Sequence, residues 1–167
     1  MSQATINVPP ASYLEDIGLA MGRIATGVYI VTAVDPSGAK VGMLASWVMQ
    51  TGFEPPSVAV AVAPERELYK AIKASGRFTV NVLAEHAYTL MKAFSHYSPD
   101  QFDKVPYQDT GCGILLNDAV SAFHCRLIEE AGETLDHRVL LGVVEGGKVL
   151  NPNTHPYIHL RKTGFSY

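Results

Sequence analysis

Residues 42–63 read GMLASWVMQTGFEPPSVAVAVA, and almost every side chain is small or apolar except at the Glu-Pro-Pro break. A strand that only filled a core would favour larger β-branched side chains over Gly42, Ala45 and Ser46. Two interpretations are open. Either something flat approaches the backbone here, or strands pack closely at a barrel corner, where glycine and alanine are common.

The sequence on either side of this segment predicts mostly β-strands. Short runs rich in β-branched residues alternate with turn residues, and Phe78, Val80 and Val82 share one face of a strictly alternating run. The predicted strands cover residues 27–34, 40–48, 57–63, 77–83, 119–130, 138–150 and 156–160. A DPSG turn at residues 35–38 joins the first two, which predicts a hairpin.

Few helices interrupt these strands. A capping box, Ser12-x-x-Glu15, opens the first helical period, and Gly76 is a typical residue to end the second. The predicted helices cover residues 12–25, 65–75 and 85–96. This order favours a mostly β fold with flanking helices, an antiparallel barrel, over a doubly wound parallel sheet.

The 167 residues predict a flexible N-terminal arm over residues 1–11 and a single domain over 12–167. Thirteen basic and sixteen acidic side chains give a net charge of -3 without a basic stripe, which argues against nucleic-acid and acidic-membrane binding. Cys112 and Cys125 are too far apart in sequence for a C-x-x-C pair. With no secretory signal and no apolar run of membrane-spanning length, we expect a soluble cytoplasmic protein.

Several catalytic motifs are absent from the sequence. There is no G-x-G-x-x-G turn followed by a helix, no Walker loop, no G-x-S-x-G and no H-E-x-x-H. His155 and His159 would share one face of a strand about 13 Å apart, too far to bind one metal ion. We therefore predict no metal site, and redox chemistry would belong to bound cofactors.

Four segments carry a resemblance to a known family. Their sequences are GRIATGVYIVTA, MLASWVMQTGFEPPSVAVAVA, GRFTVNVLAE and LDHRVLLGVV. In order and spacing they resemble flavin reductase-like domains, whose fold is an antiparallel FMN-binding split β-barrel. Together with the ending HLRKTGFSY, they look especially like the C-terminal flavin reductase module of cyanobacterial flavodiiron proteins. The resemblance covers about residues 12–167.

The resemblance implies a homodimer that binds FMN near the subunit interface and uses NAD(P)H as hydride donor. The residues that match the family's FMN contacts are Met43, Leu44, Ala45, Ser46, Trp47, Val62, Ala63, Arg66, Asn81, Val82 and Leu83. His137 matches the histidine of a Gly-Asp-His motif near the nicotinamide, although Leu135 replaces the glycine. A helix N-terminus with an arginine suits a phosphate, as this match requires.

Each assignment has a structural alternative. Arg66 could be an ordinary exposed helix residue, and Asn81 could satisfy a neighbouring loop. His137 could be a solvated loop residue, and Trp47 could belong to the core or to a dimer interface. Cys125 on its strand is interpreted as a small core residue.

The leading functional hypothesis is an FMN-binding NAD(P)H:flavin oxidoreductase that transfers a hydride from nicotinamide to flavin N5. Either nicotinamide, NADH or NADPH, fits the sequence. The alternative is an FMN-containing electron-transfer module that serves a flavodiiron-type or rubredoxin-type partner protein without oxidising nicotinamide itself. A third class is a split barrel that binds another flat ligand, such as heme or a pyridoxal derivative.

Overall fold

The computed structural model describes residues 8–111, 113–133 and 135–166. The chain divides into two compact units. The larger unit covers residues 27–158, and the smaller one joins the residues up to 26 with those from 159 onward. Most of the predicted N-terminal arm, residues 1–7, lies outside the described residues.

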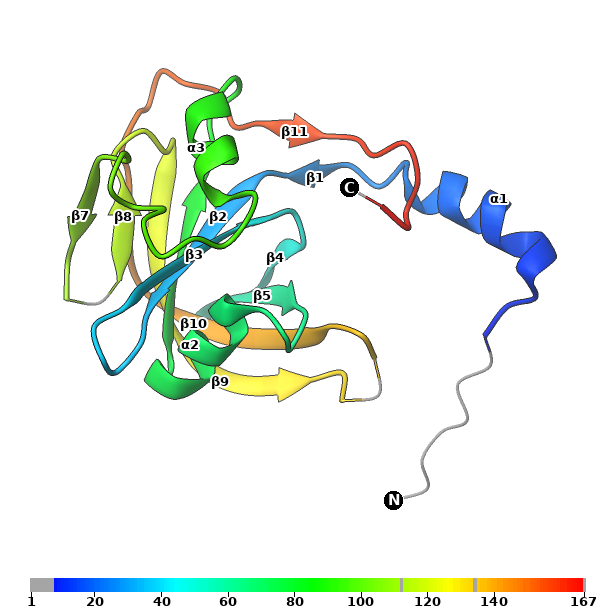
Figure 1. Ribbon diagram of the computed structural model, residues 1–167, viewed down its shortest axis with the longest axis horizontal. Coiled ribbons are helices and arrows are strands. Elements are labelled where there is room, and N and C mark those ends of the chain that lie inside the picture. Colours follow the sequence, from blue (N-terminus) through cyan, green and yellow to red (C-terminus); the bar gives the residue numbers. More distant parts are fainter. Residues whose placement is uncertain (1–7, 112, 134, 167) are drawn as a thin grey trace. The chain divides into compact units, whose positions relative to one another are not determined.

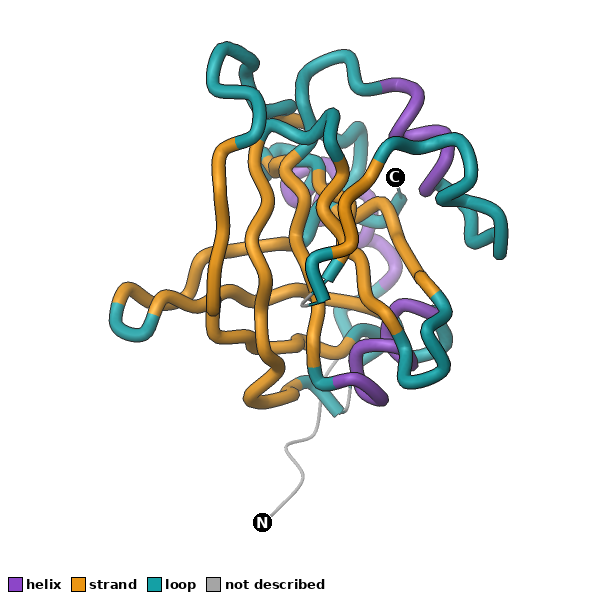
Figure 2. Tube along the Cα trace, turned by 90° about the vertical axis from the view of Figure 1, so that its left-hand side faces the viewer, coloured by secondary structure: helices purple, strands orange, loops and turns teal. Residues whose placement is uncertain are grey.

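The larger unit is built on a seven-stranded antiparallel sheet with the strand order β3-β2-β6-β9-β10-β5-β4 (Figures 1 and 2). Its strands are β2 (Tyr29–Val34), β3 (Lys40–Ala45), β4 (Val48–Phe53), β5 (Pro56–Val62), β6 (Arg77–Val82), β9 (Ser121–Ala131) and β10 (Arg138–Val149). Two-stranded sheets pair β7 (Tyr107–Asp109) with β8 (Ile114–Leu116) and β1 (Thr26–Gly27) with β11 (Ile158–His159). The helices are α1 (Ala11–Met21), α2 (Glu67–Ser75) and α3 (Tyr88–Phe94). The predicted mostly β, antiparallel split-barrel fold is confirmed.

The chain passes from one edge of the large sheet to the other through only Ser46 and Trp47. β3 and β4 are the two edge strands of this sheet and do not pair with each other. Because the three Cα–Cα steps from Ala45 to Val48 span at most about 11 Å, the sheet must curl until its edges lie close together. The result is a barrel that is split between β3 and β4.

Two apolar clusters pack against opposite faces of the sheet. Residues of alternating strand positions such as Val31, Val60 and Phe78 form the interior cluster, and α2 packs Leu68 and Ile72 against it. The second cluster is formed by residues of β2 and β3 and of the elements that cover them, α3, β7 and β8. Figure 1 shows these covering elements next to β2 and β3. The buried members of this cluster are Val28, Ile30, Leu83, Leu90, Phe94, Phe102, Val105, Ile114, Leu116 and Ala119.

The close approach that the sequence predicts at Gly42 is made by the protein's own Phe94. A Cβ atom at Gly42 would lie 2.4 Å from Cε1 of the Phe94 ring and 3.2 Å from Nε2 of Gln101. The same Gln101 amide donates a hydrogen bond of 3.2 Å to the Gly42 carbonyl. At this residue the small side chain makes room for Phe94 on α3, a packing contact with a helix rather than the strand-to-strand packing that the sequence suggested.

Several predicted element bounds differ from the structure. The capping box is wrong, because α1 starts after Pro10 without a side-chain cap, which leaves Ser12 inside the first turn. β4 was not predicted, because its polar and glycine residues form an exposed edge strand with no apolar alternation. The second helix ends as predicted at Gly76, which has a left-handed backbone conformation with φ of 70°.

In the smaller unit, α1 packs against the C-terminal segment. The Gly164 N–H donates a hydrogen bond of 2.6 Å to the Gly18 carbonyl, and a Cβ at Gly22 would meet the backbone of Arg161 and Thr163. Among the described residues, no helix is long and apolar enough to cross a membrane.

Candidate functional site

Three segments of the larger unit meet around Trp47. The Trp47 carbonyl accepts a hydrogen bond of 3.0 Å from the Ala61 N–H on β5. Arg138, the first residue of β10, pairs with Val62. The rings of Trp47 and His137 contact each other edge-on, with centroids 4.8 Å apart and an interplanar angle of 65°. The structure therefore brings together the predicted residues of the β3–β4 connection, the end of β5 and the start of β10.

Ser46 carries a buried hydroxyl that has no hydrogen-bond partner. The residue is 6% exposed, and its Oγ is shielded from solvent and makes no hydrogen bond within the protein. Leaving a buried hydroxyl unpaired costs about 1–3 kcal/mol. A ligand with a polar edge would remove this cost, so the site fits a cofactor that offers a hydrogen-bonding group beside an apolar surface.

The start of α2 adds positive potential near the end of β5. Val62 and Ala63 are buried, whereas Arg66 is exposed directly before the first residue of α2. No side chain caps this helix, so the amino end of its dipole is available to an anion. Lys70 is held by Glu67 in an ion pair of 2.6 Å. Arg66 is therefore the cation at this helix end that can best bind a phosphate.

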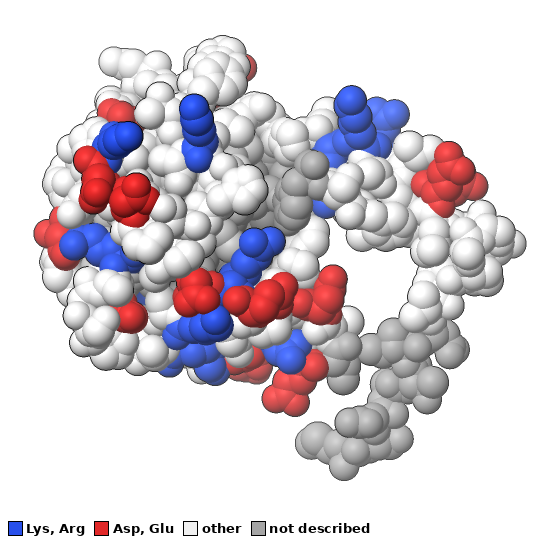
Figure 3. Space-filling view, viewed as in Figure 1, with Lys and Arg blue, Asp and Glu red and all other residues white. Residues whose placement is uncertain are grey.

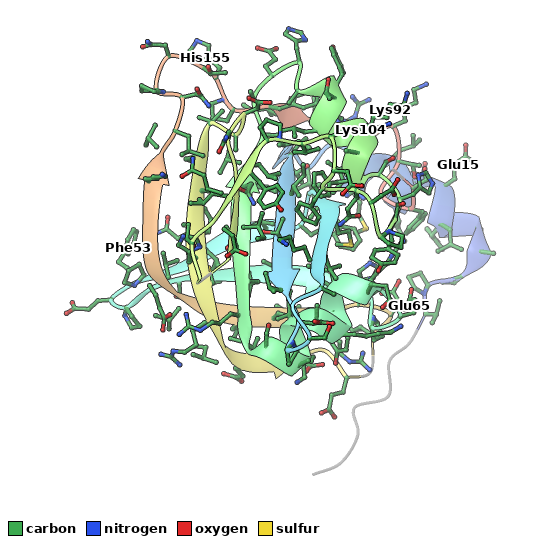
Figure 4. The ribbon with its side chains drawn as sticks, turned by 60° about the vertical axis from the view of Figure 1, so that its left-hand side comes forward. Glu15, Phe53, Glu65, Lys92, Lys104 and His155 are labelled. Atoms are coloured by element: carbon green, nitrogen blue, oxygen red, sulfur yellow. The ribbon has the colours of Figure 1, made fainter. Side chains whose placement is uncertain are left out.

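The acidic neighbours of this helix end limit its net potential. Glu65, labelled in Figure 4, lies beside the start of α2 and is exposed. Along the side of the larger unit where α2 and β9 lie, acidic and basic side chains alternate (Figure 3). An anion bound here would depend on specific contacts rather than on a broad positive field.

Asn81 is committed to the fold rather than to a ligand. It is fully buried, and its Nδ2 donates hydrogen bonds of 3.2 Å to the carbonyls of Ile30 and Ile114. Its Oδ1 accepts the Leu116 N–H at 2.8 Å. Both amide hydrogens thus hold β2 and β8, so the structural alternative describes this side chain.

The remaining predicted contacts divide between the two faces of the sheet. Met43 and Ala45 pack against the interior cluster, and Leu44 packs against the second cluster. Leu83 is fully buried in the second cluster. Val82 is half-buried, and on β6 it pairs with Tyr29 of β2 and with Ser121 of β9. Ala45, directly before Ser46, therefore belongs to the barrel interior.

A hollow lined by residues of β2, β4, β5, β9 and β10 was not predicted from the sequence. It has a volume of about 370 Å³ and is mainly apolar. The residues that line it are Tyr29, Val48, Gln50, Pro56, Ser57, Val58, Phe123 and Val144. Burial raises the pKa of the Tyr29 hydroxyl, which keeps this group protonated at neutral pH. Several lining residues belong to the unpredicted β4 and to its hairpin, and because β4 shows no apolar alternation, no local sequence signal indicated the hollow.

The described cysteine is structural. Cys125 is fully buried in the interior cluster, and burial raises the pKa of its thiol to about 12. Its interpretation as a core residue is confirmed. Within the described parts of the chain, no three His, Cys, Asp or Glu side chains come together as a metal site would require.

Comparison with known proteins identifies the family. The model of the flavin reductase like domain matches residues 21–165. Diflavin flavoprotein A 1 of a Synechocystis species is 36% identical over 157 residues, which cover 91% of this chain and 27% of that protein. Putative diflavin flavoprotein A 5 of a Nostoc species is 36% identical over 154 residues, covering 89% of this chain and 26% of that protein. The chain thus spans about a quarter of the length of these relatives.

Solved structures of similar proteins have the same fold. Component B of nitrilotriacetate monooxygenase from Mycobacterium thermoresistibile superposes with a TM-score of 0.76 at 27% identity, covering 86% of this chain and 80% of that one. The NADH:FAD oxidoreductase SgcE6 of Streptomyces globisporus, solved with NAD and FAD fragments, has a TM-score of 0.77 at 25% identity and covers 87% and 86%. The resemblance is confirmed: the chain belongs to the flavin reductase-like domain family.

Proposed function

We propose that this protein is an FMN-binding NAD(P)H:flavin oxidoreductase. The observation that carries the proposal is the buried, unpartnered Ser46 hydroxyl next to the Trp47–His137 contact, in a chain of this family. A similar protein, SgcE6, is described as an NADH:FAD oxidoreductase and was solved with NAD and FAD fragments. Membership and geometry together support a site for a flavin and a nicotinamide.

The residues of this chain would divide the work of binding and positioning. Bound FMN would supply the two-electron acceptor for a hydride from the nicotinamide. Ser46 would donate a hydrogen bond to the polar edge of the flavin ring, and Arg66 with the start of α2 would hold the phosphate. His137 and Trp47 would form the surface against which the nicotinamide is oriented. No side chain of this set needs to act as a general acid or base.

A specific observation favours a second function. The chain matches only about a quarter of each diflavin flavoprotein, so its relatives carry the same domain as one part of a longer protein. An FMN-containing module that passes electrons to a flavodiiron-type or rubredoxin-type partner would fit this arrangement. We also propose a homodimer, as the resemblance to flavin reductase-like domains implies.

The experiment compares FMN with riboflavin, which lacks the phosphate. Arg66→Met is expected to raise the Kd for FMN about tenfold, roughly 1.4 kcal/mol, and to leave the Kd for riboflavin unchanged. Lys92→Met on α3, whose position is labelled in Figure 4, is the matched control and leaves both values unchanged. A purified protein that stays colourless with FMN and oxidises neither NADH nor NADPH in the presence of flavin would contradict the proposal.

Stopped-flow mixing separates the two functions. If NADH or NADPH reduces the bound flavin, the oxidoreductase proposal stands. If the flavin stays oxidised against both nicotinamides and is reduced by a partner protein, the electron-transfer module is the correct function. A visible spectrum of the purified protein that is typical of heme or of a pyridoxal derivative would refute both.

A further inference from the structure

The loop between β9 and β10 is held by one arginine. Nη1 of Arg138 donates hydrogen bonds of 2.8 Å to the carbonyls of both Gly132 and Leu135. The Leu135 N–H in turn donates to the Gly132 carbonyl at 2.9 Å, which closes a turn. Arg138 directly follows His137 in the chain. The side chain of one residue therefore fixes the backbone on the other side of the loop that carries His137.

Glu130 orients this arginine and links it to α2. Oε1 of Glu130 lies 3.5 Å from Nε of Arg138 and accepts a hydrogen bond of 2.7 Å from the Tyr69 hydroxyl. Its Oε2 accepts a hydrogen bond of 2.5 Å from Lys73. The side chains of Glu130 and Arg138 are only 17% and 21% exposed, so solvent screens the pair less than a surface ion pair.

This network joins the two ends of the candidate site. Tyr69 and Lys73 are four residues apart and therefore lie on one face of α2, the helix that starts after Arg66. At the other end, the backbone of Arg138 is fixed in register with Val62 by the β5–β10 ladder. With its backbone fixed, the Arg138 side chain sets where the loop, and hence His137, can lie.

We propose that Arg138, oriented by Glu130, is a positioning residue that holds the His137 ring against Trp47 and thereby shapes the nicotinamide surface. The part concerning nicotinamide rests on the proposed function, whereas the position of the ring does not. A lysine could not replace this arginine, because an ammonium is a point charge that cannot serve two carbonyls and a carboxylate in one plane. Arg138 differs from the arginine of an ordinary surface ion pair because it also donates hydrogen bonds to the loop backbone.

The test follows the His137 ring directly. Trp47 is the only tryptophan in the chain, so its ring current displaces the NMR signals of the nearby imidazole, which the His137→Gln variant assigns. Trp47→Leu defines the unshifted position. In Arg138→Met, the His137 signals are expected to move most of the way to that position. Arg126→Met, which removes an arginine–carboxylate contact of 2.7 Å elsewhere on the sheet, is the matched control and leaves them in place.

The kinetic readout separates this inference from the proposed function. Arg138→Met is expected to raise KM for the nicotinamide about tenfold while the Kd for FMN changes less than about twofold. If the His137 signals move but the wild-type protein oxidises no nicotinamide, the positioning stands and the proposed function fails. If Arg138→Met does not fold, Glu130→Gln is expected to give a smaller shift in the same direction. His137 signals that stay at their wild-type positions in the folded variant overturn the inference, whatever the activity.

Discussion

Replacing Gly42 by alanine tests what the small residues of β3 are for. The new Cβ would lie 2.4 Å from the Phe94 ring, so one of the two must move about 1 Å to reach an ordinary contact. Phe94 is 1% exposed and packs edge-on against Phe102 with ring centroids 5.1 Å apart, which leaves it little room. We expect a cost near the upper end of the range for overpacking, about 2–3 kcal/mol. For a chain of this size, Tm falls by about 4 to 12 °C.

Calorimetry of four variants checks the reasoning. Gly146→Ala is the matched control, because a Cβ there meets nothing within 4 Å, and it should leave Tm nearly unchanged. Phe94→Leu destabilises by itself, but the Gly42→Ala, Phe94→Leu double variant should lose less stability than the sum of the single changes, with a coupling of about 1–2 kcal/mol. The reasoning is refuted if Gly42→Ala matches the control in Tm and instead weakens FMN binding, because Gly42 would then be small for a ligand.

Three further predictions concern buried or paired polar groups. Asn81→Leu should lower the free energy of unfolding, measured by chemical denaturation, by about 1–3 kcal/mol, because the buried Leu116 N–H loses its acceptor. It should leave the FMN affinity of the folded fraction unchanged, and a weakened affinity would show that Asn81 contacts the ligand. In a Cys112→Ser background, Cys125 should not react with a thiol reagent at neutral pH until the protein is unfolded, because burial raises the pKa of its thiol to about 12; rapid native labelling would contradict this. Hydrogen bonds from Lys73 and Tyr69 lower the pKa of the Glu130 carboxyl. The stability that the ionised carboxylate adds to the folded protein is therefore fully present above the ordinary glutamate pKa, and it is lost as the pH falls through the lowered pKa. The Tm difference between wild type and Glu130→Gln should therefore shrink as the pH is lowered from 7 to below the ordinary glutamate pKa, and a constant difference would refute this.

The strands that fill the barrel could be predicted because their side chains alternate between a core and the opposite face. Phe78 and Val80 both lie in the interior cluster, as their spacing indicates. β4 could not be predicted in this way, because an exposed edge strand has no buried face to impose a period. The predicted start of α1 was wrong for a local reason. A capping motif is short, and the helix instead starts directly after Pro10, two residues before Ser12.

The candidate site could be predicted only in part. Motif order predicts that Ser46, Trp47 and His137 belong to one site, and the structure brings Trp47 and His137 into contact. Polar residues on a strand look the same in sequence whether they face a ligand or a neighbouring hairpin, which is why Asn81 was included. Arg138 and Glu130 were missed because their partners lie on the backbone of a loop and on a helix about sixty residues away, and no local pattern records such contacts.

The two-residue passage between β3 and β4 has a consequence for how this domain can vary. Ser46 and Trp47 must span the gap between the sheet edges and also supply the candidate ligand contacts. The width of the gap therefore fixes the length of this connection, and the ligand contacts fix which residues it contains. A single inserted residue there would rotate every later side chain of β4 relative to β5 or open the seam. Natural or engineered length changes should therefore collect in the 35–38 turn rather than at the seam, and homologues that differ at the seam itself should differ in what they bind.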